Sequence, residues 1–505
     1  MVDVSARGRL ARSAPLLVAI LGAAVSLAGA GRPSFWYDEA ATISASYSRP
    51  LPALWQMLGD VDAVHGLYYL LMHGWFAVFP PTEFWSRAPS GLAVGAAAAG
   101  VVVLGTQLSS RAVGVTAGVV CAILPRATWA GIEARPYALS MLLAVWLAVL
   151  LVSAARRELR WAWAAYGVLL AVSILLDVYL ALLFFVHAVF VVTFRRRRTV
   201  VLPFVIASGV ALGVMAPFVA VVAGQAKQIS WITPIGLRTF EDVAVQQYFD
   251  RNPYLALLSA VVVLAAIGVW SFARRPSVEE RETLVLAVTW LVIPTALIVA
   301  YSAAAEPLYT PRYLCFTAPA MALLLGVCIT AVARSVRMTT VVVAAFAVVA
   351  APTYVAVQRA PYAKYDMDYS QVADLISANA AAGDCLLVND TVTFHPAPMR
   401  PLMAARPDAY GRLVDVSLWQ RALDIRQVFD TNLIPEASVG PLEHCAVVWI
   451  ITQADPVAPE HEQGVAIAPG PLFGGTHAFA VTHDMGLRLV ERWQFSLVQV
   501  LRAER

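Results

Sequence analysis

Residues 136–155 read PYALSMLLAVWLAVLLVSAA, and Arg156 and Arg157 follow directly. A transmembrane helix needs about 20 consecutive, mostly apolar residues. This stretch has that length and contains no Asp, Glu, Lys or Arg. Because Lys and Arg are enriched in cytoplasmic loops, the stretch predicts a helix that crosses a bilayer and ends at a cytoplasmic arginine pair.

Other apolar runs of the same kind fill the chain up to about residue 357. The 505-residue chain is 60% hydrophobic and 14% charged, whereas soluble domains have about 25% charged residues. We therefore expect a polytopic α-helical membrane protein with about 11 transmembrane helices. The other predicted spans lie near 14–31, 88–108, 112–130, 161–177, 178–194, 200–223, 254–273, 284–304, 313–333 and 338–356.

The first of these runs follows Arg7, Arg9 and Arg12, an arrangement that is also typical of a signal peptide. Because many more spans follow, we expect an uncleaved first span. With the N-terminus in the cytoplasm, every second break between spans carries arginines, as the positive-inside rule requires. These breaks contain Arg111; Arg156, Arg157 and Arg160; Arg195 to Arg198; Arg274, Arg275 and Arg281; Arg334 and Arg337.

The quartet Arg195 to Arg198 is therefore interpreted as an orientation signal rather than a binding patch. The net charge of +3 comes with no continuous basic face, so nucleic-acid binding is not indicated. The expected location is the plasma (inner) membrane, multi-pass, with an extracytoplasmic active site. The predicted extracytoplasmic segments are 31–87, 131–135, 224–253, 305–312 and everything after Thr353.

Two domains are expected, a transmembrane domain over 1–358 and a small extracytoplasmic α/β domain over 359–505. In the second, Tyr369–Ala381 predicts a helix, and Cys385–Val388 and Cys445–Thr452 predict short buried strands. Leu487–Leu501 predicts one or two more strands. In the first loop, the apolar stretch His65–Phe79 has only about 15 residues, too few for a comfortable span, so we expect a helix lying in the membrane interface.

The strongest chemical signal is FWYDEAAT, residues 35–42, directly after the first span. Two adjacent carboxylates near a membrane surface lose solvation unless they have a role. They could cap a helix, since acidic residues favour helix N-termini. They could also provide a general base that takes the proton of an attacking hydroxyl, and Asp38 is the first choice for that base.

The same loop continues with Asp60, Asp62 and His65. These residues could bind an acceptor, support the base or be solvated loop residues. A metal site is the least favoured of the interpretations, because the spacing fixes no coordination geometry.

Arg312 lies in the break YTPRYLCFTAP, residues 309–319, on the side where arginine is disfavoured. Its guanidinium could hold a phosphate with two hydrogen bonds, or it could snorkel to a lipid headgroup. Arg87, at the mouth of the second span, allows the same two interpretations.

Other polar residues fall on the same predicted face. Glu133 and Arg135 precede Pro136, which suits the first turn of a helix, and the two could simply pair with each other. Asp177 and Tyr179 lie at an outer turn, where a carboxylate requires water or a cleft. His187, within a span, is interpreted as a packing residue.

Five cysteines are present. No CxxC pattern occurs, so zinc and thioredoxin-type sites have no support. Cys385 and Cys445 each open a predicted strand, and strand starts share one edge of a parallel sheet. A disulfide between them is therefore possible; the alternative is two small buried core residues.

The order of these motifs resembles the C-type membrane glycosyltransferases. The resemblance covers roughly residues 10–360 and is greatest to the branch of protein O-mannosyltransferases and the lipid A aminoarabinose transferase, glycosyltransferase family 39-like. The motifs that carry it are the Asp38-Glu39 pair, DAVHGLYY (62–69), WSRAPS (85–90), EARPYAL (133–139) and PRYL (311–314).

The resemblance implies that Asp38 is the catalytic base, that Glu39 supports it, and that Arg312 and Arg87 lie near the donor phosphate. It implies an inverting transfer from a polyprenyl-phosphate sugar, without a nucleotide cofactor and without a divalent metal. The other positions that we expect to bind substrate are Asp62, His65, Tyr68, Glu133, Arg135, Tyr137, Asp177 and Tyr179.

Two departures from the family concern substrate identity. Many relatives have His-Pro-Pro where this chain has His65-Gly66-Leu67, and many have His-Tyr where it has Val178-Tyr179. The expected partners are membrane lipids, a polyprenyl-phosphate donor carrying mannose, arabinose or another sugar, and a glycan, glycolipid or protein acceptor.

An acid pair that faces outward also favours a lipid-linked donor for a separate reason, since nucleotide sugars are cytoplasmic. The competing classes are a transporter or flippase of envelope lipid intermediates, and a membrane scaffold. A transporter would usually place ionisable residues near mid-membrane and show repeat symmetry, whereas a scaffold leaves the Asp-Glu pair unexplained.

Overall fold

The structure is a computed structural model that describes residues 4–157, 160–195, 198–389 and 399–505. Arg196 and Arg197 of the predicted orientation signal lie outside the described residues. The chain divides into two compact units, each assembled from separated segments. We call 1–30, 62–68 and 87–358 the membrane unit, and 31–61, 69–86 and 359–505 the sheet unit.

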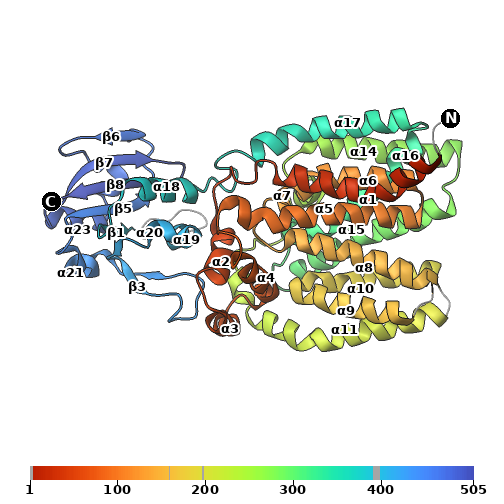
Figure 1. The fold of residues 1–505 in the computed structure, drawn as a ribbon, viewed down its shortest axis with the longest axis horizontal. Coiled ribbons are helices and arrows are strands. Elements are labelled where there is room, and N and C mark those ends of the chain that lie inside the picture. Colours follow the sequence, from red (N-terminus) through yellow and green to blue (C-terminus); the bar gives the residue numbers. More distant parts are fainter. Residues whose placement is uncertain (1–3, 158–159, 196–197, 390–398) are drawn as a thin grey trace. The chain divides into compact units, whose positions relative to one another are not determined.

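Long apolar helices form the membrane unit, and they run side by side in Figure 1. Their bounds are α1 (Val4–Leu27), α5 (Glu83–Leu108), α6 (Arg111–Ile123), α7 (Pro125–Ala130), α8 (Tyr137–Arg157), α9 (Arg160–Leu176), η2 (Val178–Leu182), α10 (Leu183–Phe194), α11 (Arg198–Gly224), α14 (Pro253–Gly268), η5 (Val269–Ala273), α15 (Val278–Ala304), η6 (Pro311–Thr317), α16 (Ala318–Val332), α17 (Val336–Pro352) and η7 (Thr353–Val357). Shorter helical segments are η1 (Ala63–His65), η3 (Ala226–Ile229), α12 (Arg238–Glu241), η4 (Asp242–Gln246) and α13 (Gln247–Phe249).

Seven helices in the described part of the chain are long and apolar enough to span a membrane. Four shorter apolar helices occupy the remaining predicted spans. The predicted polytopic helical fold is therefore confirmed, and each of the predicted runs is helical. Their lengths differ because some runs are broken: Leu124 is extended and Pro125 starts a new helix, so that α6 and α7 divide the predicted span 112–130.

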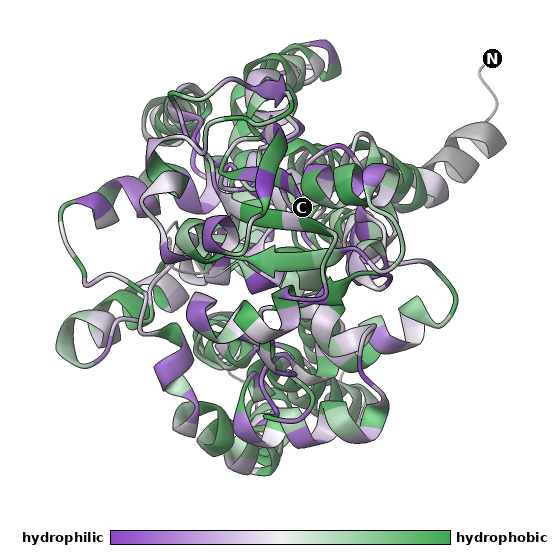
Figure 2. Ribbon diagram, turned by 90° about the vertical axis from the view of Figure 1, so that its left-hand side faces the viewer, coloured by the Kyte–Doolittle hydropathy of each residue, from purple (hydrophilic) through white to green (hydrophobic). Residues whose placement is uncertain are grey.

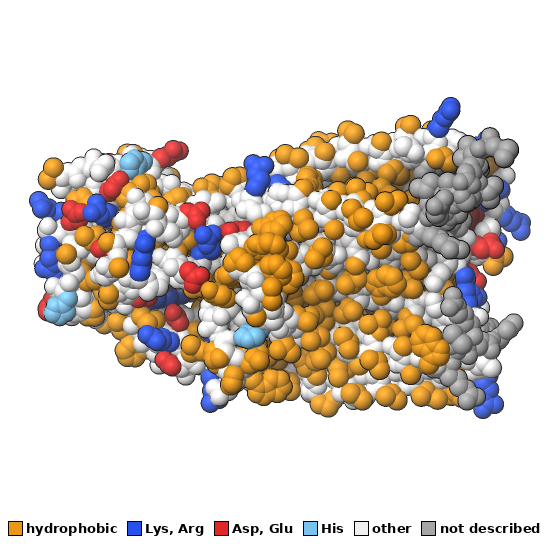
Figure 3. All heavy atoms as spheres, in the orientation of Figure 1, with side chains coloured by type: hydrophobic (Ala, Val, Ile, Leu, Met, Phe, Trp, Pro, Cys, Tyr) orange, Lys and Arg blue, Asp and Glu red, His pale blue; other side chains and the backbone are white. Residues whose placement is uncertain are grey.

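The outside of the membrane unit is apolar. Hydrophobic side chains cover the visible face of the bundle in Figure 3, and only 11% of the apolar window of α11 is buried within the protein. Exposed apolar area of this extent requires a nonaqueous partner. Together with the helix lengths, it identifies a multi-pass membrane protein.

Inside the bundle, small residues let helices approach closely, as is usual in membranes where no hydrophobic force drives helices together. A Cβ added to Gly95 of α5 would lie 2.4 Å from the carbonyl oxygen of Ala19 in α1. A Cβ on Gly326 of α16 would lie 2.6 Å from the Cβ of Ala117 in α6. Larger residues at these two positions would separate the helices.

The sheet unit is built on a six-stranded sheet with the order β2-β1-β5-β8-β7-β6. Strand β1 pairs in parallel with β2 and β5, and the other pairs of this sheet are antiparallel. The strands are β1 (Cys385–Val388), β2 (Val414–Asp415), β5 (Val447–Gln453), β6 (His461–Gln463), β7 (Arg488–Gln494) and β8 (Val498–Glu504), with a separate pair β3 (Leu418–Gln420) and β4 (Thr431–Asn432).

Short helices complete this unit. They are α2 (Tyr37–Ser46), α3 (Leu51–Asp60), α18 (Tyr369–Asn379), α19 (Arg400–Ala405), α20 (Pro407–Tyr410), η8 (Pro435–Ser438), α21 (Val439–Leu442), α22 (Pro471–Gly474) and α23 (His477–Asp484). Helix α4 (Gly66–Phe76) contains residues of both units. Its 11 residues extend about 16 Å, well short of a hydrocarbon core of about 30 Å. Its location in the membrane interface stays a prediction.

The central strands are hydrophobic, as their colour in Figure 2 shows, and β1 is buried along its whole length. Strand β5 lies directly beside β1, with Cys385 opposite Val448. Cys445 comes just before β5, and its Cα lies 5.9 Å from that of Cys385. The two residues form a disulfide that closes a 60-residue separation.

Candidate active site

Asp38 and Glu39 lie in the first turn of α2, in the sheet unit. Carboxylates are favoured at this end of a helix, so the position itself agrees with the capping interpretation. The two side chains differ in exposure, because Asp38 is partly exposed and Glu39 is fully buried. Of the pair, Asp38 is thus the carboxylate that a substrate can reach.

Glu39 has a charged partner that no sequence motif marks. The Lys364 ammonium nitrogen lies 3.7 Å from Glu39 Oε1, and the lysine side chain is 3% exposed. Lys364 belongs to the segment that follows the last predicted span. A contact between residues so far apart in the chain leaves no local pattern.

Both ends of α2 are held by the segment between β3 and β4. Arg49, just beyond the helix, donates hydrogen bonds to the carbonyl oxygens of Gln427 and Val428. The rings of Tyr37 and Phe429 pack edge to face at 5.1 Å between centroids. These contacts fix the position of α2 within the sheet unit.

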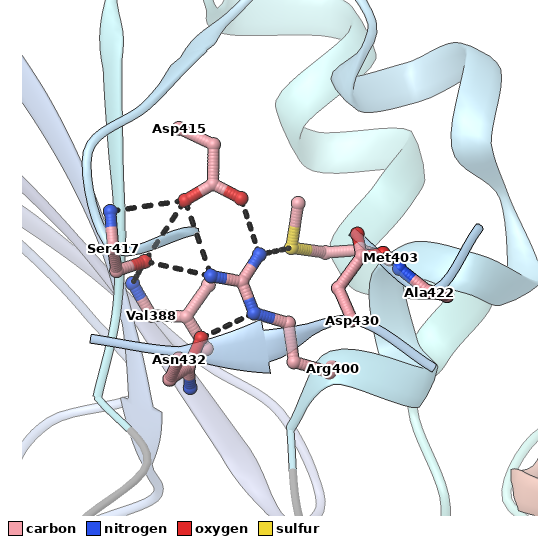
Figure 4. A network of polar contacts seen from close by, with 8 residues as sticks. All are labelled: Val388, Arg400, Met403, Asp415, Ser417, Ala422, Asp430 and Asn432. Carbon is pink, nitrogen blue, oxygen red and sulfur yellow. Dashed lines mark hydrogen bonds and ion pairs between the residues drawn. The ribbon is translucent and has the colours of Figure 1, made fainter. Parts of the chain in front are cut away.

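A buried arginine organises that segment in turn (Figure 4). The Arg400 guanidinium donates to both carboxylate oxygens of Asp415 and, through Nε, to Asn432. Ser417 Oγ accepts a further bond of 3.3 Å from the same guanidinium. Because Asp415 balances its charge, we assign Arg400 a structural task.

A second group of predicted site residues converges in the membrane unit. Arg135 Nη2 donates to His65 Nε2 over 2.5 Å. Burial, with the nearby Arg135 and Arg312 guanidinium charges, holds the pKa of His65 well below its usual value. His65 is therefore neutral at pH 7, and two arginine guanidinium groups lie near it.

Aromatic rings line this cationic group. The Arg312 guanidinium carbon lies 4.8 Å from the ring centroid of Trp231 and 5.7 Å from that of Tyr313. Tyr313 in turn contacts Tyr137 at 6.4 Å and Tyr179 at 5.7 Å. Arginine over an aromatic face is stabilised and oriented by cation–π attraction. Tyr313 belongs to the PRYL motif, whereas Trp231 lies outside every motif that carries the resemblance.

Three further predicted residues have well-defined contacts. Asp177 caps η2, where Oδ1 accepts from the Tyr179 amide at 3.0 Å and Oδ2 accepts from Ser140 at 2.8 Å. The Tyr179 hydroxyl donates to the carbonyl oxygen of Leu308 at 2.9 Å. Asp62 is left-handed, with φ 59°, and its amide donates to Gln228 at 3.1 Å.

The remaining positions are buried. Tyr68 is 0% exposed and Glu133 is 1% exposed, and the Glu133 carbonyl accepts a 2.6 Å bond from Ser90. Arg87 is also 0% exposed, and its Nη1 donates to the carbonyl of Ala30 at 2.7 Å. That contact ties the start of α5 to the segment after α1. A phosphate-binding role for Arg87 stays a prediction.

The predicted residues therefore form two groups that lie in different units. His65, Arg135, Tyr137, Asp177, Tyr179 and Arg312 share the membrane unit, together with Asp62, Tyr68, Glu133 and Arg87; Asp38 and Glu39 belong to the sheet unit. Among the residues that the structure describes, no group of three His, Cys, Asp or Glu side chains could hold a metal ion.

The arrangement of long apolar helices and one small sheet unit is similar to the fold of ArnT from Cupriavidus metallidurans. ArnT is an aminoarabinose transferase of the C-type membrane glycosyltransferases. Its apo structure has a TM-score of 0.56 and 12% identity to this chain, and covers 99% of this chain and 98% of its own. Its structure bound to undecaprenyl phosphate has a TM-score of 0.53, with the same identity and coverage. No protein-family model and no curated protein matches the chain.

Proposed function

We propose that this protein is an inverting glycosyltransferase that moves a sugar from a polyprenyl-phosphate donor to an acceptor on the outer face of the membrane. The observation that carries the proposal is the pair of arginines, Arg135 and Arg312, that both act on the buried His65. Two guanidinium groups near one neutral histidine are suited to a phosphate, which guanidinium groups bind with paired hydrogen bonds.

The likeness of the fold to ArnT supports a lipid-linked donor, since ArnT was solved with undecaprenyl phosphate. In this proposal Arg312 binds the donor phosphate, and Arg135 takes the role that the resemblance implies for Arg87. Arg87 is fully buried with a carbonyl partner, so it would have to rearrange to reach a phosphate.

The reaction requires one base and one means of stabilising the leaving group. Asp38 would take the proton of the acceptor hydroxyl as its oxygen bonds to the anomeric carbon. The bond from that carbon to the phosphate oxygen breaks, and the polyprenyl phosphate leaves with the electron pair. The arginines would stabilise the negative charge on the departing phosphate. No cofactor or metal enters the proposed reaction.

The proposed sugar is mannose or arabinose, and the proposed acceptor is a cell-envelope glycan, glycolipid or protein. The experiment that tests the activity uses full-length protein in lipid nanodiscs. It is incubated with a panel of polyprenyl-phosphate sugars and envelope glycan acceptors, and transfer is followed by mass spectrometry. Transfer with inversion at the anomeric carbon is expected. Movement of the intact lipid between the two leaflets of sealed proteoliposomes, without sugar transfer, would instead identify a flippase.

A further inference from the structure

The segment that follows the last span holds the residues just before α2. Within the sheet unit, the Ser34 amide donates to the Pro361 carbonyl at 2.8 Å. The Phe35 amide donates to Ser370 Oγ at 3.0 Å, and the Ser370 amide donates to Ser34 Oγ at 3.1 Å. One main-chain hydrogen bond and two hydrogen bonds to serine hydroxyls thereby fasten the segment 359–370 to the residues just before α2.

The middle of this segment has an unusual backbone. Tyr365 and Asp366 are both left-handed, with φ of 55° and 59°. Non-glycine residues rarely adopt this region, and they persist there only when the surrounding structure requires it. The Tyr365 ring stacks on Trp36, with centroids 4.7 Å apart and 28° between the planes. The turn is therefore held against the residue that precedes α2.

The same turn places the Lys364 ammonium group beside the buried Glu39 carboxylate. Lys364 is 3% exposed, and its ammonium lies 3.7 Å from Glu39 Oε1, in a side chain that is 0% exposed. Removing one partner of a buried ion pair leaves an uncompensated charge, which is strongly destabilising. The positive charge of Lys364, a residue far from Glu39 in the sequence, consequently restrains the Glu39 carboxylate.

We propose that Lys364 is a positioning residue for glycosyl transfer. It fixes the Glu39 carboxylate, and through Glu39 it fixes the first turn of α2, which carries Asp38. The inference rests on the proposed function and adds to it a residue that acts without touching substrate. A carboxylate that must meet a hydroxyl proton in a narrow range of geometry loses rate when it is misplaced by about 1 Å.

A double-mutant cycle on the full-length protein in nanodiscs tests this inference. The variants are Lys364→Met, Glu39→Gln and the two combined, with Lys364→Arg as the conservative replacement. We expect Lys364→Met to lower kcat by about 10- to 100-fold with a smaller change in donor KM, and Lys364→Arg to recover much of the loss. The combined variant should be no slower than the slower single variant, because both act through one contact.

The matched control is Arg492→Met. Arg492 is 1% exposed and pairs with Glu462 at 2.8 Å in the same unit, but it lies on β7 and makes none of the contacts described for α2. Its loss should leave kcat within about twofold of the parent per folded molecule. The double variant removes both buried charges, so comparing it with Glu39→Gln still tests the inference if Lys364→Met alone folds poorly: equal turnover supports it, and a further loss contradicts it.

Amide hydrogen exchange over residues 34–47 provides a readout that needs no substrate. We expect faster exchange there in Lys364→Met and parent-like exchange in Arg492→Met. Parent-like exchange and turnover in folded Lys364→Met would overturn the inference, as would losses that multiply in the double variant. If the parent itself transfers no sugar, the proposed function fails, and the exchange result still decides whether Lys364 positions α2.

Discussion

Adjacent carboxylates at the start of α2 differ in access, and this difference separates their roles. Asp38 is partly exposed, whereas Glu39 is fully buried against Lys364. A base must reach the proton that it removes, which Glu39 cannot do in this arrangement. We therefore assign proton transfer to Asp38 and a supporting role to Glu39.

Replacing Asp38 with Asn is expected to leave the protein folded and membrane-inserted, since the change keeps size and removes only charge. Sugar transfer should fall by about 10²–10⁴-fold, the range for loss of a general base. Glu39→Gln should cost less. Initial rates on purified protein, normalised to the folded fraction, measure both effects. Near-parent turnover of the Asp38 variant would reject Asp38 as the base.

The variant Arg312→Lys tests whether the Arg312 guanidinium binds the donor phosphate. Lysine keeps the charge but loses the planar two-point contact, and it loses the guanidinium that lies over Trp231. Donor affinity should fall about tenfold, with acceptor affinity little changed. Arg126→Lys is the matched control, because Arg126 also lies 4.8 Å over a tryptophan, Trp129, but pairs with Asp250. Equal weakening of both substrates by Arg312→Lys would indicate a structural residue.

Among the elements, α18 is anchored to the sheet by one buried carboxylate. Asp368 precedes the helix, and its Oδ2 accepts from the amides of Leu497 and Val498, at the start of β8, at 2.8 and 2.9 Å. Burial is the main cause that raises the Asp368 pKa to about 6, although these hydrogen bonds oppose the shift. The folded state thus favours the protonated form of the Asp368 carboxyl group more than the unfolded chain does.

The sign of the pH dependence follows from that preference. An unfolded Asp has a pKa of about 3.9, so between about pH 4 and 6 the folded unit holds the proton more tightly than the unfolded chain. The free energy of unfolding should therefore fall as pH rises through this window, by about 3 kcal/mol in total. Asp368→Asn should remove this slope, as seen in thermal unfolding of parent and variant between pH 4.5 and 7. An unchanged slope in the variant would contradict the assignment.

The boundaries of the strands show which elements can be predicted from the sequence. Strand β1 matches its predicted bounds, because a short, fully buried apolar run between polar breaks has a clear pattern. Strand β6, His461–Gln463, was missed because its residues are polar and partly or fully exposed. The pairing of β1 with β5 brought Cys385 and Cys445 together as the shared-edge argument anticipated.

The sequence predicted only those site residues that belong to local motifs. The resemblance selected Arg135, Arg312 and His65, and the structure gathers them in one unit. Lys364 and Trp231 were not predicted as site residues, because they belong to no local motif. Their partners come from distant segments of the chain. Charge and periodicity describe neighbours along the chain, whereas these contacts depend on the tertiary fold.

At the scale of the whole molecule, orientation in the membrane stays a prediction that single cysteines can test. Ser48, Ser230 and Ser277 are exposed, while the free cysteines Cys121, Cys315 and Cys328 are buried and should give little background. With an impermeant thiol reagent outside intact cells, cysteines at 48 and 230 should label and one at 277 should not. Labelling at 277 alone would invert the topology. Ser46 is 1% exposed and is unsuitable as a labelling site.

The two stretches of the sheet unit that meet at Phe35 and Ser370 are separated by 335 residues. At synthesis rates of roughly 5–20 residues per second, the later stretch leaves the ribosome about 20–60 s after the earlier one. During that interval the Asp38 helix has neither its Lys364 partner nor its Trp36–Tyr365 stack. A nascent chain therefore carries its proposed catalytic residue for most of its synthesis without the contacts that hold it in place, and a chain that stops early never acquires them.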